Sequence, residues 1–195
     1  MKNLKKYILS TFAVLACVTM LTGCGGGDKQ KVMVCTPKDE YNANNGIQFE
    51  VADDGKTIEK IIYQEGYTKA FIEHWYPDAD VDAAFNELTG RVESTLTMMT
   101  EGTKGAKWID AALDLDKENY SVKGVLTIDV TDESFTSDED AMLGYLKAIG
   151  FDKYYNADEK RFEVDPAIVE KSTADSWMPL TCELKEVKVE KTDKK

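Results

Sequence analysis

One amphipathic helix constrains the fold of this chain more than any other feature of its sequence. Over residues 79–99, apolar side chains recur at steps of three and four residues, which is the spacing of a single helix face. They are Val81, Ala84, Phe85, Leu88, Val92, Leu96 and Met99. Asp78 is the predicted N-cap and Gly102 the predicted stop. Glu87 and Arg91 have the i,i+4 spacing of an ion pair on the exposed face of the helix. Because one apolar face is buried only against another element, this helix predicts a layered domain.

Alternating apolar residues predict the strands that such a helix needs. In residues 47–51 they alternate with polar ones, Asp54-Gly55 marks a tight turn, and residues 58–63 resume an apolar strand. This order predicts a β-hairpin. The same alternation predicts further strands over residues 31–36, 120–130 and 180–189. A shift of phase in the last strand predicts a bulge near Lys185-Glu186.

Local capping signals predict shorter helices in the second half of the chain. Ser137 begins a capping box with Asp140, and Gly150 fits the left-handed position after that helix. Asp165, followed by proline, begins a short helix to about residue 171. A further helical turn is predicted around residues 108–113.

Two stretches are less regular than the rest. Residues 67–77 are rich in aromatic side chains and fit either a strand or a helical turn, and residues 151–155 are predicted to form an edge strand. Strands and helices are mixed rather than regularly alternating, which favours the α+β class. We therefore expect a single domain over residues 31–190, an antiparallel sheet with helices packed on one face, and a frayed tail at 191–195.

The N-terminus has the anatomy of a cleaved secretory leader. Three lysines precede an apolar run over residues 8–21, which is too short and too closely followed by three glycines for a comfortable spanning helix. The run ends in Leu21-Thr22-Gly23-Cys24, which resembles the lipobox of bacterial lipoproteins. The resemblance implies a signal peptide at 1–23, a diacylglycerol on Cys24, and a tether at 24–30 that holds the domain on the extracytoplasmic face of a bacterial membrane. The alternative is an ordinary secreted protein in which Cys24 is incidental.

The charge of the chain excludes one class of partner. The formal net charge is −12, and removal of the leader takes away three lysines and no acidic residue, leaving −15. Such a surface repels phosphate backbones and anionic headgroups, so no nucleic acid is expected as a partner. We expect the covalent lipid on Cys24, rather than surface charge, to hold the protein on its membrane.

Two cysteines remain once Cys17 leaves with the leader and Cys24 carries lipid. Cys35 and Cys182 lie in strand-like runs near opposite ends of the domain, in a compartment where disulfides persist. Chain ends of compact domains often lie close together, so the two residues are a candidate disulfide. The alternative is a pair of buried free thiols acting as small hydrophobes. Their wide spacing matches neither a redox motif nor a zinc knuckle.

The order of elements resembles that of small bacterial lipoproteins of the YehR type. These proteins share a lipobox, an extended hairpin, an amphipathic helix, a strand and a late capped helix that ends in Ala-x-Gly-Phe. Here that motif stands as Ala148-Ile149-Gly150-Phe151, and the likeness covers roughly residues 47–155. The resemblance implies a single α+β domain. It brings no established activity, cofactor or catalytic residue to this chain, and residues after 156 have no counterpart in it.

Residues capable of catalysis or metal binding are present, but their spacing matches no known catalytic or metal-binding motif. His74 is the only histidine, and no serine or cysteine in a strained glycine-flanked turn accompanies it. The spacing of Asp78, Asp80 and Asp82 is that of the first residues of an EF-hand calcium loop. However, Ala83 stands where the EF-hand needs glycine, so helix capping explains the three aspartates better. Close pairs of carboxylates are expected by chance among 36 acidic residues. We therefore predict no catalytic residue, no metal and no cofactor.

Aromatic residues close to prolines are the remaining candidates for a site. Trp75 and Tyr76 precede Pro77, and Trp177 lies two residues before another proline, in positions where loops form. Such aromatics either cover the edge of a core or act as binding anchors. The leading hypothesis is a non-enzymatic binding module for an envelope protein, a peptide or a glycan. The alternative is a small hydrolase with two carboxylates in a cleft, one of them with a raised pKa.

Overall fold

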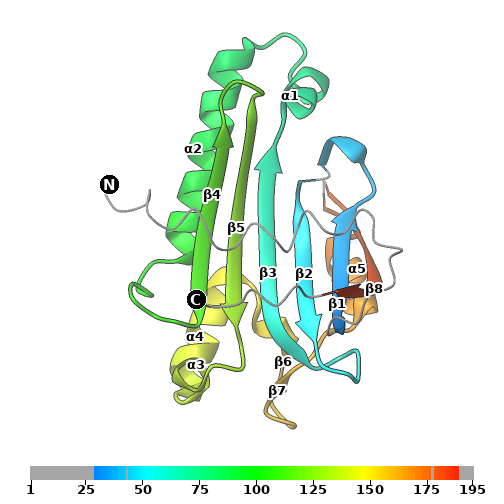
Figure 1. Ribbon diagram of the computed structural model, residues 1–195, viewed down its shortest axis with the longest axis vertical. Helices are drawn as coiled ribbons and strands as arrows, with labels where there is room; N and C mark the ends of the chain where they lie inside the picture. Colours follow the sequence, from blue (N-terminus) through cyan, green and yellow to red (C-terminus); the bar gives the residue numbers. More distant parts are fainter. Residues whose placement is uncertain (1–28, 43, 177, 189–195) are drawn as a thin grey trace.

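The computed structural model describes residues 29–42, 44–176 and 178–188, and its centre is one antiparallel sheet (Figure 1). Six strands lie in the order β4-β5-β3-β2-β1-β8. Their bounds are β1 Lys29–Pro37, β2 Gly46–Val51, β3 Ile58–Tyr67, β4 Ile109–Asp116, β5 Ser121–Asp129 and β8 Leu180–Lys188. The pairs β3–β5 and β1–β8 join strands that are far apart in the sequence. The predicted hairpin is confirmed as β2 and β3.

The main helices pack on one face of this sheet, which confirms the predicted α+β class (Figure 1). The helices are α1 Lys69–Trp75, α2 Val81–Met99, α3 Glu133–Thr136, α4 Glu139–Ile149 and α5 Pro166–Thr173. Two 3-10 turns, η3 Glu40–Asn42 and η4 Asp152–Tyr154, and a small hairpin of β6 Tyr155–Asn156 and β7 Arg161–Phe162 complete the domain. The short α1 lies beyond the end of the sheet, directly after β3.

Helix α2 buries its predicted apolar stripe against β3 and β5. Its buried residues are Phe85, Leu88, Val92, Leu96 and Met99. The helix lies close to the sheet at Gly124 of β5, where an added Cβ would lie 2.6 Å from Val92 Cγ1 and 3.0 Å from Leu96 Cδ1. A glycine is therefore required here for the helix to reach the sheet.

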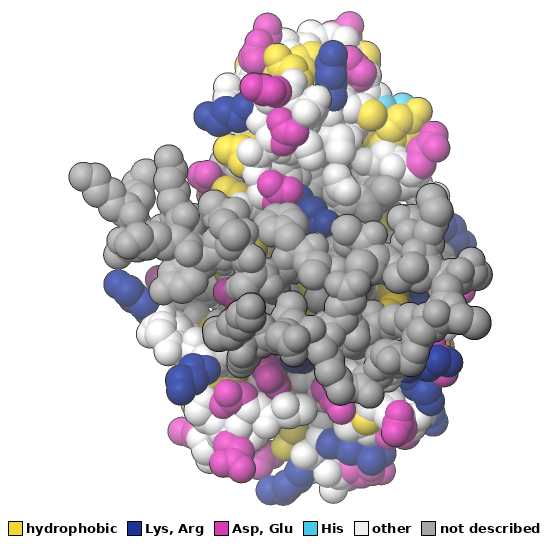
Figure 2. Space-filling view, viewed as in Figure 1, with side chains coloured by type: hydrophobic (Ala, Val, Ile, Leu, Met, Phe, Trp, Pro, Cys, Tyr) yellow, Lys and Arg dark blue, Asp and Glu magenta, His cyan; other side chains and the backbone are white. Residues whose placement is uncertain are grey.

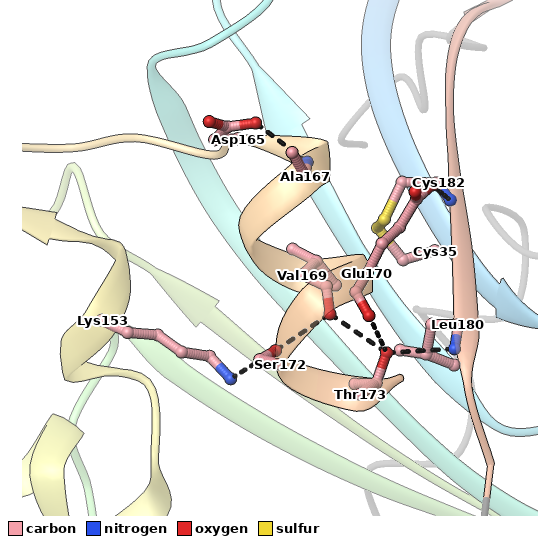
Figure 3. The surroundings of a disulfide bond; sticks show 10 residues. All are labelled: Cys35, Lys153, Asp165, Ala167, Val169, Glu170, Ser172, Thr173, Leu180 and Cys182. Carbon is pink, nitrogen blue, oxygen red and sulfur yellow. Dashed lines mark hydrogen bonds between the residues drawn. A yellow bond between two sulfur atoms is a disulfide. The ribbon is translucent and has the colours of Figure 1, made fainter. Parts of the chain in front are cut away.

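The two ends of the described chain meet at one end of the sheet, because β1 and β8 pair along their whole length from Lys29↔Lys188 to Pro37↔Leu180. Within this register Cys35 and Cys182 are directly opposed, with Cα atoms 4.0 Å apart, and they form a disulfide (Figure 3). Helix α5 secures the same strand, since the Cys182 backbone N–H donates to a carboxylate oxygen of Glu170 at 2.9 Å.

Residues 108–113 do not form the predicted helical turn. They belong to β4 and the residue before it, and β4 pairs with β5 over its full length. Every second residue of β4 faces the core on one side of the sheet, as the packing of Ile109, Ala111, Leu113 and Leu115 shows, and three aspartates and Ala112 stand between them and after the last. Pairing with a neighbouring strand overrides the helix preference of the Ala-Ala-Leu segment.

Two predicted N-caps are wrong by one or two residues. Helix α2 is capped by Asp80 rather than Asp78, because the Asp80 side chain accepts a hydrogen bond from the Ala83 backbone N–H at 2.9 Å. Helix α4 is capped by Asp138 rather than Ser137, which instead ends α3. Several capping residues stand side by side in both places, so the sequence alone does not select among them.

Three predicted details of the strands are also wrong. The edge strand expected over 151–155 is mostly the turn η4, because Phe151 closes the end of α4 with a backbone N–H bond to Leu146 O at 2.8 Å. The register of β8 runs without a bulge near Lys185. Strand β1 begins at Lys29, two residues earlier than expected, so it takes up part of the predicted tether.

Candidate functional site

The structure places two of the predicted site residues together and leaves others outside its described part. Trp75 ends α1 and Tyr76 follows it, and these side chains are 48% and 45% exposed. Cys24 and Trp177 lie outside the described residues, as do the predicted signal peptide and tail. The candidate site is therefore built around α1.

Trp75 and Tyr76 border a hollow of about 340 Å³ at the end of the sheet away from Lys29, which we call the distal groove. Its lining residues are Tyr67, Phe71, Trp75, Tyr76, Leu88 and Arg91. Figure 2 shows hydrophobic side chains gathered beside the single histidine on this part of the surface. Phe71 is the centre of the cluster, with its ring 4.8 Å from that of Tyr67 and 6.2 Å from that of Tyr76. The groove is thus an aromatic surface with one charged residue, Arg91.

Local sequence explains why these aromatics reach the surface. Thr68 caps α1 by accepting a hydrogen bond from the Phe71 backbone N–H at 3.3 Å. The helix stops at Trp75, because helical geometry is disfavoured for a residue before proline, and Tyr76 stands before Pro77. Tyr76 accordingly has φ −132° and ψ 56°. This early stop sets the positions of Trp75 and Tyr76 beside the hollow.

A buried asparagine holds the end of β3 on which the groove is built. Asn45 donates from Nδ2 to Gly66 O at 2.9 Å and accepts from Gly66 N at 3.1 Å through Oδ1. Gly66 directly precedes Tyr67, so this two-point contact fixes the floor of the groove relative to the loop after η3. The floor of the groove is therefore preorganised.

Beneath the groove lies a buried carboxylate with three partners. Glu65 accepts hydrogen bonds from the hydroxyls of Tyr67 at 2.8 Å and Tyr63 at 3.3 Å. Arg91 Nε lies 3.5 Å from Glu65 Oε1. Burial, with a further contribution from the Glu65 charge, raises the pKa of both tyrosines, so their hydroxyls stay protonated donors at neutral pH. Glu65 thereby links β3 to α2.

The contact between Glu65 and Arg91 differs from the sequence expectation and has a structural cause. The spacing of Glu87 and Arg91 is that of an exposed ion pair within the helix. Arg91 instead turns to Glu65, which lies opposite Gly124 on β5, where the side chains of α2 lie close to the sheet. The sequence signal for this site was a charged residue between Tyr63 and Tyr67, in the phase of β3 that faces the helices.

His74 extends the aromatic surface. Its ring stacks on that of Tyr41 in η3 with centroids 4.0 Å apart and planes at 7°. The Trp75 ring stands edge-on to it at 5.0 Å. An exposed imidazole between two aromatic rings adds flat surface next to the distal groove.

A second hollow, of about 400 Å³, lies at the opposite end of the sheet, beside Lys29. We call it the proximal hollow, and its lining is mostly polar: Lys29, Gln30, Lys31, Val51, Ala52, Asp53, Asp54 and Glu59. Gln30 Nε2 donates to Val51 O at 3.0 Å and to Glu59 Oε2 at 3.3 Å. Gln30 therefore links β1 to β2 and β3 across this hollow.

Three of the acidic residues serve as helix caps or turn anchors. Asp80 caps α2 and Asp132 caps α3, while Asp116 accepts from the backbone N–H groups of Glu118 and Asn119 at 3.1 Å each. Each carboxyl of the described residues whose pKa is displaced has it lowered, through hydrogen bonds to the charged form. In the same residues no three metal-ligating side chains gather, and no helix is long and apolar enough to cross a membrane.

Comparison with known proteins identifies no family. No protein-family model matches the chain, and no curated protein matches it. Among solved structures it is similar to a protein from Streptococcus pneumoniae TIGR4 determined by NMR. The identity is 9%, the match covers 80% of this chain and 96% of the other, and the TM-score is 0.29. A likeness that weak says nothing about function, and the resemblance to YehR-type lipoproteins stays a prediction.

Proposed function

We propose that this chain is a lipid-anchored bacterial envelope protein whose domain binds another molecule through the distal groove. The observation that carries the proposal is the groove itself, where Trp75 and Tyr76 leave about half of their surface in water beside a hollow of about 340 Å³. Exposed aromatics that border a concave surface are typical anchors in binding sites.

The position of the groove suits a protein anchored at its N-terminus. Strand β1 is nine residues long and runs from the proximal hollow towards η3 (Figure 1). At roughly 3.3 Å per residue it separates the two ends of the sheet by about 26 Å. A lipid on Cys24 would hold the proximal end near the membrane and present the distal groove away from it.

The carboxylates favour binding over hydrolysis. A general acid needs a raised pKa, whereas hydrogen bonds lower the pKa of Asp54 in the proximal hollow. The one deeply placed carboxylate beside the distal groove, Glu65, already accepts hydrogen bonds from two tyrosines and pairs with Arg91. These contacts support a site that holds a ligand rather than one that transfers protons.

The anchor is tested by metabolic labelling with a palmitate analogue. Cys24→Ala should abolish labelling and leave the leader uncut, because the thiol is the predicted site of lipid attachment. Cys17→Ala, at the other cysteine of the leader, is the matched control and should keep full labelling. Membrane association of a lipid-free Cys24→Ala protein whose leader has been removed would contradict the proposed anchor.

The groove is tested in cells with a photo-crosslinking amino acid placed at position 75 or at position 168. Trp75 and Ile168 are equally exposed, at 48% each, but Ile168 lies on α5 outside the distal groove. We expect a discrete adduct from position 75, reduced by Tyr76→Ala, and none from position 168. Equal adducts from both positions, or none from position 75, would exclude the groove as the binding surface.

A further inference from the structure

We propose that the distal groove recognises the C-terminal residue of a peptide, with the apolar side chain in the aromatic hollow and the carboxylate paired with Arg91. This inference rests on the proposed function, because it names the ligand class of the same groove. Its starting point is charge: Arg91 is the one charged residue among the six that line the hollow.

Arg91 has guanidinium N–H groups that are available to a ligand. Its Nε faces Glu65 Oε1 at 3.5 Å, and its side chain is 57% exposed. Among the described residues no other ion-pair or hydrogen-bond partner contacts the guanidinium. The remaining N–H groups form a planar fork, which matches the two oxygens of a carboxylate in a way that a lysine ammonium does not.

Glu65 acts as a positioning residue for this fork. Its side chain is only 9% exposed and accepts hydrogen bonds from Tyr63 and Tyr67, so it stays in place on β3. Pairing at Nε draws the guanidinium towards the groove and away from Glu87, the partner expected within the helix. A preorganised cation loses less side-chain entropy when a ligand binds.

The apolar lining selects the rest of the ligand. Phe71 and Leu88 are buried below the hollow, and the Tyr67 hydroxyl is already bonded to Glu65. Few polar groups are left for the many hydroxyls of a sugar, whereas a large apolar side chain fits such a lining. In a terminal residue the carboxylate and the side chain branch from the same Cα, so one residue contacts both the rings and Arg91.

The acidic character of the whole chain does not prevent this contact. At physiological ionic strength the charges of a protein surface are screened beyond about 8 Å. A single carboxylate in contact with a guanidinium lies well inside that distance, whereas a polyanion would also meet the many acidic side chains of the surface. The chemistry thus favours a short peptide end over an extended anionic polymer.

The test measures fluorescence anisotropy with the full chain extracted from membranes in detergent. The probes are fluorescein-labelled Gly-Gly-Gly-Phe with a free C-terminal carboxylate, the same peptide as its C-terminal amide, and Gly-Gly-Gly-Gly with a free carboxylate. We expect the Phe acid to bind at least tenfold more tightly than the Phe amide, and more tightly than the Gly peptide. Equal affinities for the acid and the amide would overturn the proposal.

Variants separate recognition of the carboxylate from a general loss of structure. Arg91→Gln should remove the preference for the acid over the amide, and Glu65→Gln should reduce that preference. Arg161→Gln, at the only other arginine of the chain, which pairs with Glu159 and Glu163 on β7 and its turn, should keep the full preference. Thermal melts monitored by circular dichroism confirm that each variant is folded. A folded Arg91→Gln protein that keeps the tenfold preference would exclude Arg91 as the carboxylate partner.

Failure of this inference and failure of the proposed function give different results. If no peptide binds while the crosslinker at position 75 still forms its Tyr76-dependent adduct, the peptide terminus is wrong and the binding groove stands. If neither peptide binding nor the adduct is found, both proposals fail.

Discussion

The two ends of the sheet expose different kinds of surface: paired polar groups at the proximal end and aromatic side chains at the distal end. At the proximal end, Lys29 pairs with Glu186 at 2.9 Å and Lys31 Nζ donates to Asp53 O, so charged groups meet partners from this chain. At the distal end, the aromatic residues Trp75 and Tyr76 remain half in water beside the groove. Polar groups that are already paired within the chain gain little from a ligand. An exposed aromatic groove, in contrast, is stabilised when a ligand covers its apolar area.

The same contrast extends to how each end is stabilised. The distal half of β1 carries the disulfide between Cys35 and Cys182 and lies near the buried bonds of Asn45 with Gly66. The proximal end relies on exposed ion pairs and on a hairpin turn closed by Asp54. We therefore expect the largest effects on stability from changes at the distal end.

Loss of the disulfide should produce the largest effect. The bond closes a loop with a sequence separation of 147, and in the chain-entropy model its removal lowers the free energy of unfolding by up to about 5 kcal/mol. Cys182→Ser should show this in denaturant melts, while lipid labelling at Cys24 stays unchanged. Alkylation of both thiols in denaturant without reductant would show that no bridge forms.

Removal of one carboxylate at each end compares a buried network with an exposed pair. Glu65→Ala leaves the hydroxyls of Tyr63 and Tyr67 without their acceptor and should lower the free energy of unfolding by about 1–3 kcal/mol. Glu186→Ala breaks the exposed pair with Lys29 and should leave stability nearly unchanged. Urea melts of both variants measure the difference. Equal losses would remove the energetic distinction between the two ends.

The elements predicted best from the sequence are those defined by periodicity and local caps. The stripe of α2, the hairpin of β2 and β3, and the Asp165 cap of α5 depend on residues close to one another in the chain. Strand β4 was mistaken for a helical turn because its conformation depends on pairing with β5. Local preference for helix is weak compared with a full ladder of strand hydrogen bonds.

The candidate site likewise contains some residues that local sequence predicts and others whose role depends on contacts between distant segments. Trp75 and Tyr76 were recognised because a proline follows them, which is a local signal. Arg91 was missed as part of the site because its local partner on the helix, Glu87, explained it fully. Its true partner, Glu65, is reached only because Gly124 lets α2 lie close to the sheet, and no sequence spacing shows that approach.

A small effect that depends on pH is expected at the proximal turn. Asp54 accepts hydrogen bonds from the side chain of Thr57 and from the backbone N–H groups of Lys56 and Thr57, which lowers its pKa from 3.8 to about 2. A carboxyl with a lowered pKa stabilises the fold above its ordinary pKa, and the contribution is lost as the pH falls through the folded value. Asp54→Asn should therefore melt at a lower temperature than the parent chain at pH 7, with a difference that shrinks between about pH 4 and pH 2.

Asp53→Asn supplies the matched control for this prediction. Asp53 is the neighbouring acid in the same turn, and its carboxylate accepts no hydrogen bond from a described residue, since only its backbone oxygen contacts Lys31. Its substitution should shift the melting temperature little and equally at both ends of the pH range. If Asp54→Asn shows the same flat difference, the hydrogen bonds of Asp54 do not stabilise the turn. The stability of the proximal end would then depend on the contacts of its lysines alone. The difference in stabilisation between the proximal and distal ends would be larger than proposed.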